Sequence, residues 1–314
     1  MQRITGAASV SLVERVARLW GGYGELWRAE LTLAAGKTTV IVKHVRPPPG
    51  EQSRSHRRKL RSYAVEHAFY QRYAARCAAA PGCRVPRPLQ LASEAGSWLF
   101  VLEDLDASGF AERRTRAEPT QIRATLRWLA GFHARFLGCG PEQLWKTGSY
   151  WHLATRPDEL AAMRHPALRA AAPAIDAALE AATFKTLVHG DAKLENVCFS
   201  RGADEVALVD FQYVGGGVGV KDVAYFLSSC LRPSECEALV PPYLDDYFRE
   251  LGREVRAGDA SIDFSALERQ WRALFPFAWL DYYRFLLGWA PGQFDGERYG
   301  EALFQQLQGS LKSG

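Results

Sequence analysis

The sequence predicts an α+β protein of two lobes or domains, with strands concentrated in the first third and helices dominating the rest. The chain has 314 residues, which exceeds the usual size of a single hydrophobic core. Residues 38–45 are dense in β-branched side chains, and residues 98–105 begin as an apolar run, as a buried strand does, and then run into acidic residues. Residues 121–136 instead repeat apolar side chains at helical spacing. At 47% hydrophobic residues, the composition is that of a globular protein.

The first predicted element is a strand, turn and strand around residues 20–27. Gly21, Gly22 and Gly24 lie between the apolar or alternating stretches 16–20 and 26–33. Glycines there would let backbone amides approach phosphates, whereas a dinucleotide fold needs Gly-x-Gly-x-x-Gly opening a helix. An ordinary glycine hairpin is the simpler alternative, and turn chemistry alone leaves both open.

The next predicted strand, residues 38–45, carries Lys43 near its end and is closed by a turn at residues 47–50. A lysine on a central strand is costly to bury unless it is paired, so Lys43 either faces outward or binds a phosphate. A helix is predicted at residues 63–76, where Glu66 borders an apolar stripe. The basic residues between Arg54 and Arg61 are expected in a solvated loop and helix start just before it.

The polar residues of the segment His189 to Asn196 predict phosphoryl-transfer chemistry. Asp191 and Asn196 are five positions apart after the apolar run 186–188, which is the layout of a kinase catalytic loop. Such a reaction needs a carboxylate beside the attacking hydroxyl and oxygen ligands for magnesium. A second carboxylate, Asp210, follows the apolar stretch 206–209, where a strand end would direct it to the same metal.

These motifs resemble the aminoglycoside phosphotransferase and choline kinase superfamily, which has a bilobal protein-kinase-like fold. The form Asp210-Phe211-Gln212, followed by residues 221–226, is most similar to its ecdysteroid-kinase-like branch. The resemblance implies a small N-terminal nucleotide-binding lobe of antiparallel strands and one helix at residues 1–102. It also implies a hinge at residues 103–106 and a larger, mainly helical catalytic and substrate-binding lobe at residues 107–314.

The resemblance also assigns roles to individual residues. It implies that Asp191 is the catalytic base and that Asn196 and Asp210 bind magnesium. It implies that Lys43, paired with Glu66, orients the α- and β-phosphates of ATP. The remaining cofactor-binding positions are Gly21, Gly22 and Gly24 over the phosphates, and the hinge residues Glu103, Asp104 and Leu105, whose backbone binds adenine.

Four further residues of the second lobe are given roles. Lys193 is expected to stabilise charge on the transferred phosphoryl group, with an exposed loop lysine as the alternative. His133 and His189 are expected to be structural. Asp222 precedes an apolar helix and is expected to be its N-cap, and the resemblance adds a bond back to the catalytic loop.

The glycine-rich connection and the C-terminal aromatics bear on the kind of kinase. Residues 215–219 contain four glycines, so this connection is expected to be short and mobile, and no Ala-Pro-Glu follows it. Residues 271–289 are rich in aromatics, which either form core or wall an acceptor site for an apolar hydroxylated molecule. Asp281 would alternatively meet a cationic acceptor.

The sequence therefore predicts a magnesium-dependent kinase that transfers the γ-phosphoryl group of ATP to a hydroxyl of a small molecule. The alternatives are a protein Ser/Thr kinase-like enzyme, a nucleotide-binding module without catalysis, and nucleic-acid binding through residues 54–61. The net charge of +4 does not by itself imply a nucleic-acid partner. Six cysteines without a Cys-x-x-Cys pair suggest neither zinc nor disulfides, and no apolar run is long enough for a membrane, so the protein is expected to be cytoplasmic.

Overall fold

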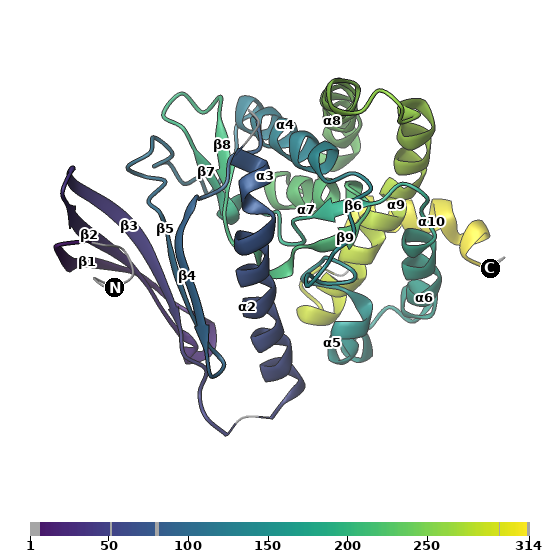
Figure 1. The fold of residues 1–314 in the computed structure, drawn as a ribbon. Helices are drawn as coiled ribbons and strands as arrows, with labels where there is room; N and C mark the ends of the chain where they lie inside the picture. The colour runs from purple at the N-terminus through teal and green to yellow at the C-terminus, as the bar shows by residue number, and fades with distance from the viewer. Residues whose placement is uncertain (1–6, 51, 79–81, 295, 313–314) are drawn as a thin grey trace. The chain divides into compact units, whose positions relative to one another are not determined.

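The computed structural model describes residues 7–50, 52–78, 82–294 and 296–312 (Figure 1). The chain divides into two compact units, and the first is discontinuous in sequence. It comprises Met1–Arg113 together with Cys198–Gln212, while the second comprises Arg114–Val197 together with Tyr213–Gly314. The hinge at residues 103–106 and the lobe boundaries on either side of it remain predictions.

The first unit contains a five-stranded antiparallel sheet in the order β1-β2-β3-β5-β4. Its strands are β1 (Ser9–Arg18), β2 (Gly24–Leu33), β3 (Gly36–Val45), β4 (Pro88–Glu94) and β5 (Ser97–Glu103). The predicted strands around Lys43 and ahead of the hinge correspond to β3 and β5. Gly24 begins β2 with φ +137°, and a Cβ there would lie 2.0 Å from the carbonyl oxygen of His44. Only glycine therefore fits where β2 meets β3.

Helix α2 (Arg54–Arg72) packs on strands β4 and β5 (Figure 1). Ser53 begins it as N-cap, with its Oγ accepting from the His56 amide at 3.0 Å. The expected loop before residue 63 is thus wrong, because the basic residues from Arg54 to Arg61 belong to the helix itself. The helix also ends at Arg72, before the short helix α3 (Ala74–Ala78), rather than continuing to residue 76.

The later segment of the first unit adds a second, two-stranded sheet, formed by β7 (Val197–Phe199) and β8 (Val206–Leu208). Cys198 and Ala207 pack with Leu105 and Phe110 in a buried apolar cluster. Cys198 is therefore a buried residue on a strand. Leu105 and Phe110 thus share one core with residues about ninety positions later in the chain.

The second unit is mainly helical. Its helices are α4 (Pro119–Arg135), α5 (Pro157–Ala162), α6 (Pro166–Glu180), α7 (Val220–Cys230), α8 (Cys236–Gly258), α9 (Phe264–Trp289) and α10 (Arg298–Lys312). Helix α4 packs on α8, and α9 packs on α5, α6 and α7. Two short strands, β6 (Thr186–Val188) and β9 (Gly215–Gly217), pair antiparallel next to the catalytic segment.

Strand β9 corrects the expectation of a mobile glycine connection. Its three glycines pair in register with β6. A Cβ on Gly215 would lie 2.2 Å from the carbonyl oxygen of Trp145. These glycines therefore permit close backbone packing, and they do not mark a mobile segment.

Two findings concern the chain as a whole. The six cysteines, all in the described ranges, are free thiols. Among the helices of the described residues, none is long and apolar enough to cross a membrane.

Candidate active site

Lys43 and Glu66 form a buried ion pair in the first unit. Lys43 Nζ lies 2.9 Å and 2.7 Å from the two carboxylate oxygens of Glu66. Lys43 is 6% exposed and Glu66 2% exposed. Burial by itself lowers the pKa of Lys43, but Glu66 and Asp210 raise it above its ordinary value. Burial raises the pKa of Glu66 to about 7, although Lys43 lowers it. The two groups are therefore buried together as a pair, and Lys43 does not face outward.

Asp210 stands next to this pair in an unusual backbone conformation. Its φ is +69°, a region that non-glycine residues seldom adopt. Its Oδ1 atom is buried and has no hydrogen-bond partner among the residues that the structure describes. The following residues are fixed: Phe211 stacks on Phe69 with ring centroids 3.9 Å apart, and Gln212 Oε1 accepts from Ser62 Oγ at 3.1 Å. A rigid frame thus presents one unused carboxylate oxygen.

The glycine turn between β1 and β2 is a short 3-10 segment, Trp20–Gly22. Gly21 and Gly22 have φ of +70° and +77°. Lys59 of α2 contacts the turn, with its Nζ 4.2 Å from the Trp20 ring centroid and 3.1 Å from the Trp20 carbonyl oxygen. The predicted strand, turn and strand are confirmed, while the contact of Gly21, Gly22 and Gly24 with phosphates remains a prediction.

At the predicted hinge, the acidic side chains are engaged in local bonds. Glu103 accepts from Arg84 and from Ser108, and Asp104 forms an ion pair with Arg28 at 2.8 Å. The Leu105 amide makes no hydrogen bond to another described residue, whereas its carbonyl accepts from Phe110 at 2.8 Å. The side chains thus fix the segment and leave a backbone donor available.

In the second unit, Asp222 holds the start of the catalytic loop. Its carboxylate accepts from the backbone amides of His189 at 2.6 Å and Gly190 at 2.9 Å, and it contacts His133 Nε2 at 3.0 Å. The other ring nitrogen of His133 contacts the Tyr247 hydroxyl at 2.9 Å. The predicted bond back to the loop is confirmed, and His133 is a satisfied core residue. The N-cap prediction is wrong, because α7 begins at Val220 and Asp222 lies inside its first turn.

Asp191 and Asn196 lie together within this loop. Asn196 Nδ2 donates to the Asp191 carbonyl oxygen at 2.8 Å and to its Oδ2 at 3.1 Å. Since the amide nitrogen faces these two acceptors, the Asn196 Oδ1 atom is left facing away from them. The Asp191 amide donates to His189 Nδ1 at 3.2 Å, in line with a structural role for that histidine. Lys193 is half-buried beside the turn Leu194–Asn196, and its role remains a prediction.

Tyr225 is a neighbour of Asp191 that sequence reasoning missed. Burial raises the pKa of Tyr225 far above its usual value, and the Asp191 carboxylate and a hydrogen bond to it add to this effect. The Tyr225 ring packs on Trp151 and Tyr282, with centroids 4.7 Å and 4.6 Å away. No local signal identified Tyr225, because it lies within an ordinary apolar helix pattern.

Asp281 is not available to a cationic acceptor. It is fully buried in α9, with Oδ1 2.5 Å from Arg284 Nη2 and Oδ2 3.0 Å from Lys221 Nζ. Trp151 Nε1 also donates to Oδ2 at 2.9 Å. Burial alone would raise the pKa of Asp281, but Lys221 and Arg284 hold it below its usual range. The cationic-acceptor expectation for this residue is therefore wrong.

The sequence model of the phosphotransferase enzyme family matches residues 27–283, which include the Lys43–Glu66 pair, the catalytic loop and Asp210. This chain belongs to the phosphotransferase enzyme family. No curated protein sequence matches it.

The solved structures that resemble this chain are distant in sequence. An aminoglycoside phosphotransferase from Streptomyces rimosus, solved with ADP and streptomycin, is 18% identical, with 85% of this chain and 92% of that chain covered and a TM-score of 0.48. An ethanolamine kinase from Plasmodium vivax is 11% identical, with 95% of this chain and 81% of that chain covered and a TM-score of 0.51. The second likeness confirms the predicted α+β, protein-kinase-like fold.

Proposed function

We propose that this phosphotransferase is a magnesium-dependent kinase that transfers the γ-phosphoryl group of ATP to a hydroxyl of a small molecule. The observation that carries the proposal is the geometry of the catalytic loop. Asp191 is 7% exposed, and its carboxylate is oriented by Asn196 while Asp222 fixes the backbone that precedes it. A carboxylate held in this way suits the base that positions an attacking hydroxyl.

The proposed roles of the charged side chains follow from phosphoryl transfer. Asp191 accepts the proton of the acceptor hydroxyl as its oxygen bonds to the γ-phosphorus and the bond to the β-phosphate oxygen breaks, releasing ADP. Lys193 offsets negative charge on the transferred group. Lys43, kept charged by Glu66, binds the α- and β-phosphates. Gly21, Gly22, Gly24 and the backbone of Glu103 to Leu105 complete the proposed nucleotide contacts.

The donor set suits a divalent cation. Asp210 Oδ1 is buried with no hydrogen-bond partner among the described residues, and Asn196 uses its amide nitrogen for Asp191. Each residue therefore offers an oxygen that the described residues leave to another ligand, and carboxylate and amide oxygens are ligands that magnesium accepts. We propose that Asn196 and Asp210 bind magnesium, which when bound neutralises charge on the ATP phosphates.

Two features favour a small-molecule kinase over a protein kinase. The family match is to phosphotransferases. The segment after Asp210 runs directly into β9, which pairs with β6, so the chain has no long activation segment in this described region. A module without catalysis is less well supported, because Asp191, Asn196 and Asp210 are all present.

The acceptor is proposed to be an apolar hydroxylated molecule, as the ecdysteroid-kinase-like branch would suggest. Tyr225 and Tyr282 lie close enough to Asp191 for its charge to raise the pKa of both hydroxyls, after burial, which is the larger cause. Asp281 is already paired with two cations and adds no carboxylate for a cationic acceptor. Aromatic rings beside the proposed base favour contact with apolar surface.

The test is a panel of hydroxyl compounds incubated with magnesium and ATP and scored by ADP release. The panel should include sterols, macrolides, aminoglycosides, choline and sugars. Asp191→Asn is the blank, and Asp259→Asn, at an exposed loop, is the matched control that should retain wild-type release. At least one compound should raise ADP release in the wild type and not in the blank. If none does, or if the blank responds equally, the proposed function is overturned.

A further inference from the structure

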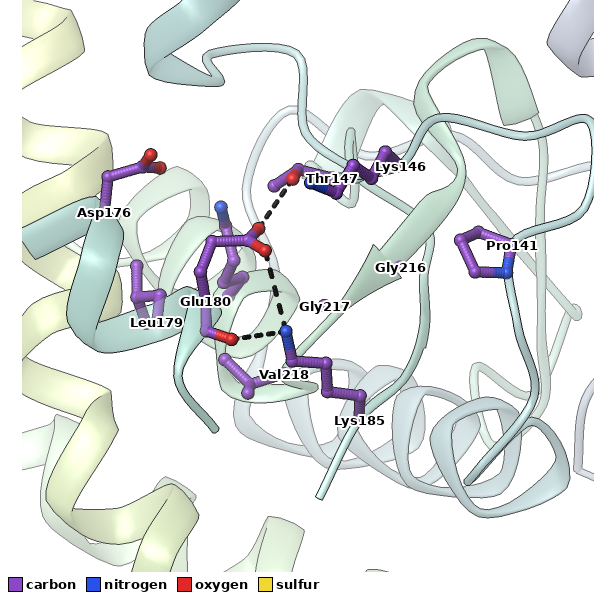
Figure 2. A pocket seen from close by; sticks show the side chains of 11 residues that line it. Pro141, Lys146, Thr147, Asp176, Leu179, Glu180, Lys185, Gly216, Gly217 and Val218 are labelled. Atoms are coloured by element: carbon purple, nitrogen blue, oxygen red, sulfur yellow. Dashed lines mark hydrogen bonds and ion pairs between the residues drawn. The ribbon is translucent and has the colours of Figure 1, made fainter. Parts of the chain in front are cut away.

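The second unit contains a cavity of about 200 Å³ that is separate from the catalytic loop (Figure 2). It is bounded by the end of α6, by β9 and the start of α7, and by residues 141–147. None of the residues that line it belongs to the segment 189–196. Figure 2 shows Glu180 with Thr147 and Lys185 at one side of this space. Lys221 of α7 also lines the cavity.

The ammonium group of Lys221 is buried with hydrogen-bonding capacity to spare. Lys221 is 2% exposed and forms an ion pair with Asp281 Oδ2 at 3.0 Å. Its Nζ makes no well-formed hydrogen bond to the residues that the structure describes. A lysine has three N–H donors, so at least two are left without an acceptor among the described residues.

Asp281 cannot accept all the hydrogen bonds that Lys221 can donate, because its carboxylate also bonds to other residues. Its two oxygens also serve Arg284 and Trp151, with Arg284 Nη2 2.5 Å from Oδ1 and Trp151 Nε1 2.9 Å from Oδ2. Arg284 is 1% exposed. Over the described residues, no other carboxylate forms an ion pair with Lys221 or Arg284. Two buried cations thus share one carboxylate, and a buried charge without a counter-charge is costly.

The acidic residues of the cavity wall have other partners. Glu180 accepts from the Thr147 hydroxyl at 2.6 Å and lies 3.6 Å from Lys185 Nζ. Asp176 lies 3.5 Å from His152 Nδ1. Neither acid pairs with Lys221, and the residues that line the cavity include three lysines, Lys146, Lys185 and Lys221, against these two carboxylates.

We propose that this cavity is a binding site for a small anion bearing a carboxylate or phosphate group, which accepts hydrogen bonds from Lys221. A volume of about 200 Å³ exceeds the roughly 30 Å³ that one water molecule occupies in the liquid, so a ligand the size of phosphate or a short dicarboxylate fits. Such a ligand supplies the missing negative charge and acceptors together.

The site is positioned to affect the catalytic loop. Lys221 is followed directly by Asp222, whose carboxylate accepts from the His189 and Gly190 amides. The cavity wall also includes Gly216 and Gly217, which pair with Leu187 and Thr186 of the strand leading to that loop. An anion on Lys221 therefore rigidifies the first turn of α7, from which the loop is held.

The test is the melting temperature of the full chain in sodium phosphate or sodium succinate, compared with sodium chloride at equal ionic strength and with neutral succinamide. For the wild type, an anion at about 100 times its Kd should raise Tm by several degrees over chloride. Lys221→Met should fold, since Asp281 keeps Arg284 as a partner, and should lose this shift. Lys37→Met, at a lysine 67% exposed, should keep it.

A second variant tests the proposal independently in case Lys221→Met does not fold. Leu179→Phe adds bulk to the cavity wall without removing a charge, and it should also reduce the shift. Equal shifts in the wild type and in both cavity variants, or no shift with either anion, would overturn the proposal. Because the readout is thermal and needs no acceptor or ATP, its failure is separable from failure of the proposed kinase activity.

Discussion

Phe69 and Phe211 stack almost face to face, with ring centroids 3.9 Å apart and planes 9° apart. Phe69 lies one helical turn after Glu66 on α2, and Phe211 directly follows Asp210. The stack therefore joins the helix that carries one proposed nucleotide residue to the segment that carries a proposed metal ligand. Both rings are fully buried.

Phe211→Ala should lower the free energy of unfolding by about 3–5 kcal/mol, because it removes a large buried ring and leaves a cavity. Urea unfolding followed by tryptophan fluorescence measures this change. Trp20→Ala is the control, since Trp20 is 82% exposed and its loss should change stability little. Equal effects of the two variants would contradict a packing role for the stack.

Replacing Lys43 by Met should destabilise the first unit by about 3–5 kcal/mol, because Glu66 is left as a buried charge without its partner. The double variant Lys43→Met with Glu66→Met should recover much of this loss, since it removes both buried charges. Both should lose ATP affinity, measured by calorimetry. Additive losses in the double variant would show that the two residues do not act as a pair.

Asp222→Asn should both destabilise the chain and slow turnover. Asparagine keeps only one oxygen acceptor, so one of the His189 and Gly190 amides loses its bond, at a cost of about 1–3 kcal/mol. With an acceptor found by the panel, kcat should fall while KM for ATP stays near wild type. Asp245→Asn, at an exposed ion pair with Arg272, is expected to change neither quantity.

Lys193→Met should lower kcat by about 10²–10³-fold if this lysine stabilises charge in the transition state. Stability should be unaffected, because the side chain is only half-buried. Lys193→Arg, which keeps the charge, should retain part of the rate. A fall in ATP affinity with unchanged kcat would instead assign Lys193 to ground-state binding.

The contribution of Asp281 to the free energy of unfolding should depend on pH. Lys221 and Arg284 outweigh the effect of burial and hold its pKa below the ordinary 3.8. A carboxyl group with a lowered folded-state pKa stabilises the native state fully above its unfolded pKa and loses that contribution as pH falls. Asp281→Asn should therefore be destabilised by about 3–5 kcal/mol at neutral pH, because two cations lose their counter-charge.

The difference in the free energy of unfolding between wild type and Asp281→Asn should then narrow as the pH is lowered through and below 3.8. Urea midpoints measured across an acid series give this gap directly. A gap that is constant or widens toward low pH would mean that Asp281 is not ionised in the folded protein.

Local sequence pattern predicted much of the fold because each of the patterns that identify it lies within a few consecutive residues. The β-branched run around Lys43 is β3, the apolar run ahead of Glu103 is β5, and the spacing of Asp191 and Asn196 corresponds to side chains in direct contact. The start of α2 was missed, although Ser53 is a residue type favoured at N-caps, and the helix ends at Arg72 rather than at residue 76. The run of basic residues that follows Ser53 is typical of a solvated loop and obscures this cap in the sequence.

The sequence alone does not indicate which residues far apart in the chain contact one another. Asp281 reads as a single acid in an aromatic helix, and only the packing of α7 on α9 pairs it with Lys221. Asp222 fits an N-cap by its local context, but its carboxylate is used by the loop after β6. The glycines 215–217 indicate mobility by composition, whereas the close approach of Trp145 requires them.

The split of the first unit into Met1–Arg113 and Cys198–Gln212 has a consequence for biosynthesis. Leu105 and Phe110 have no apolar cover from Cys198 and Ala207 until the ribosome has released the chain well past position 207. During translation this apolar cluster of the first unit stays uncovered while the whole of α4 to β6 emerges. A fragment truncated near residue 113 would therefore be prone to aggregate, and expression of this unit alone requires the later segment to be joined to it.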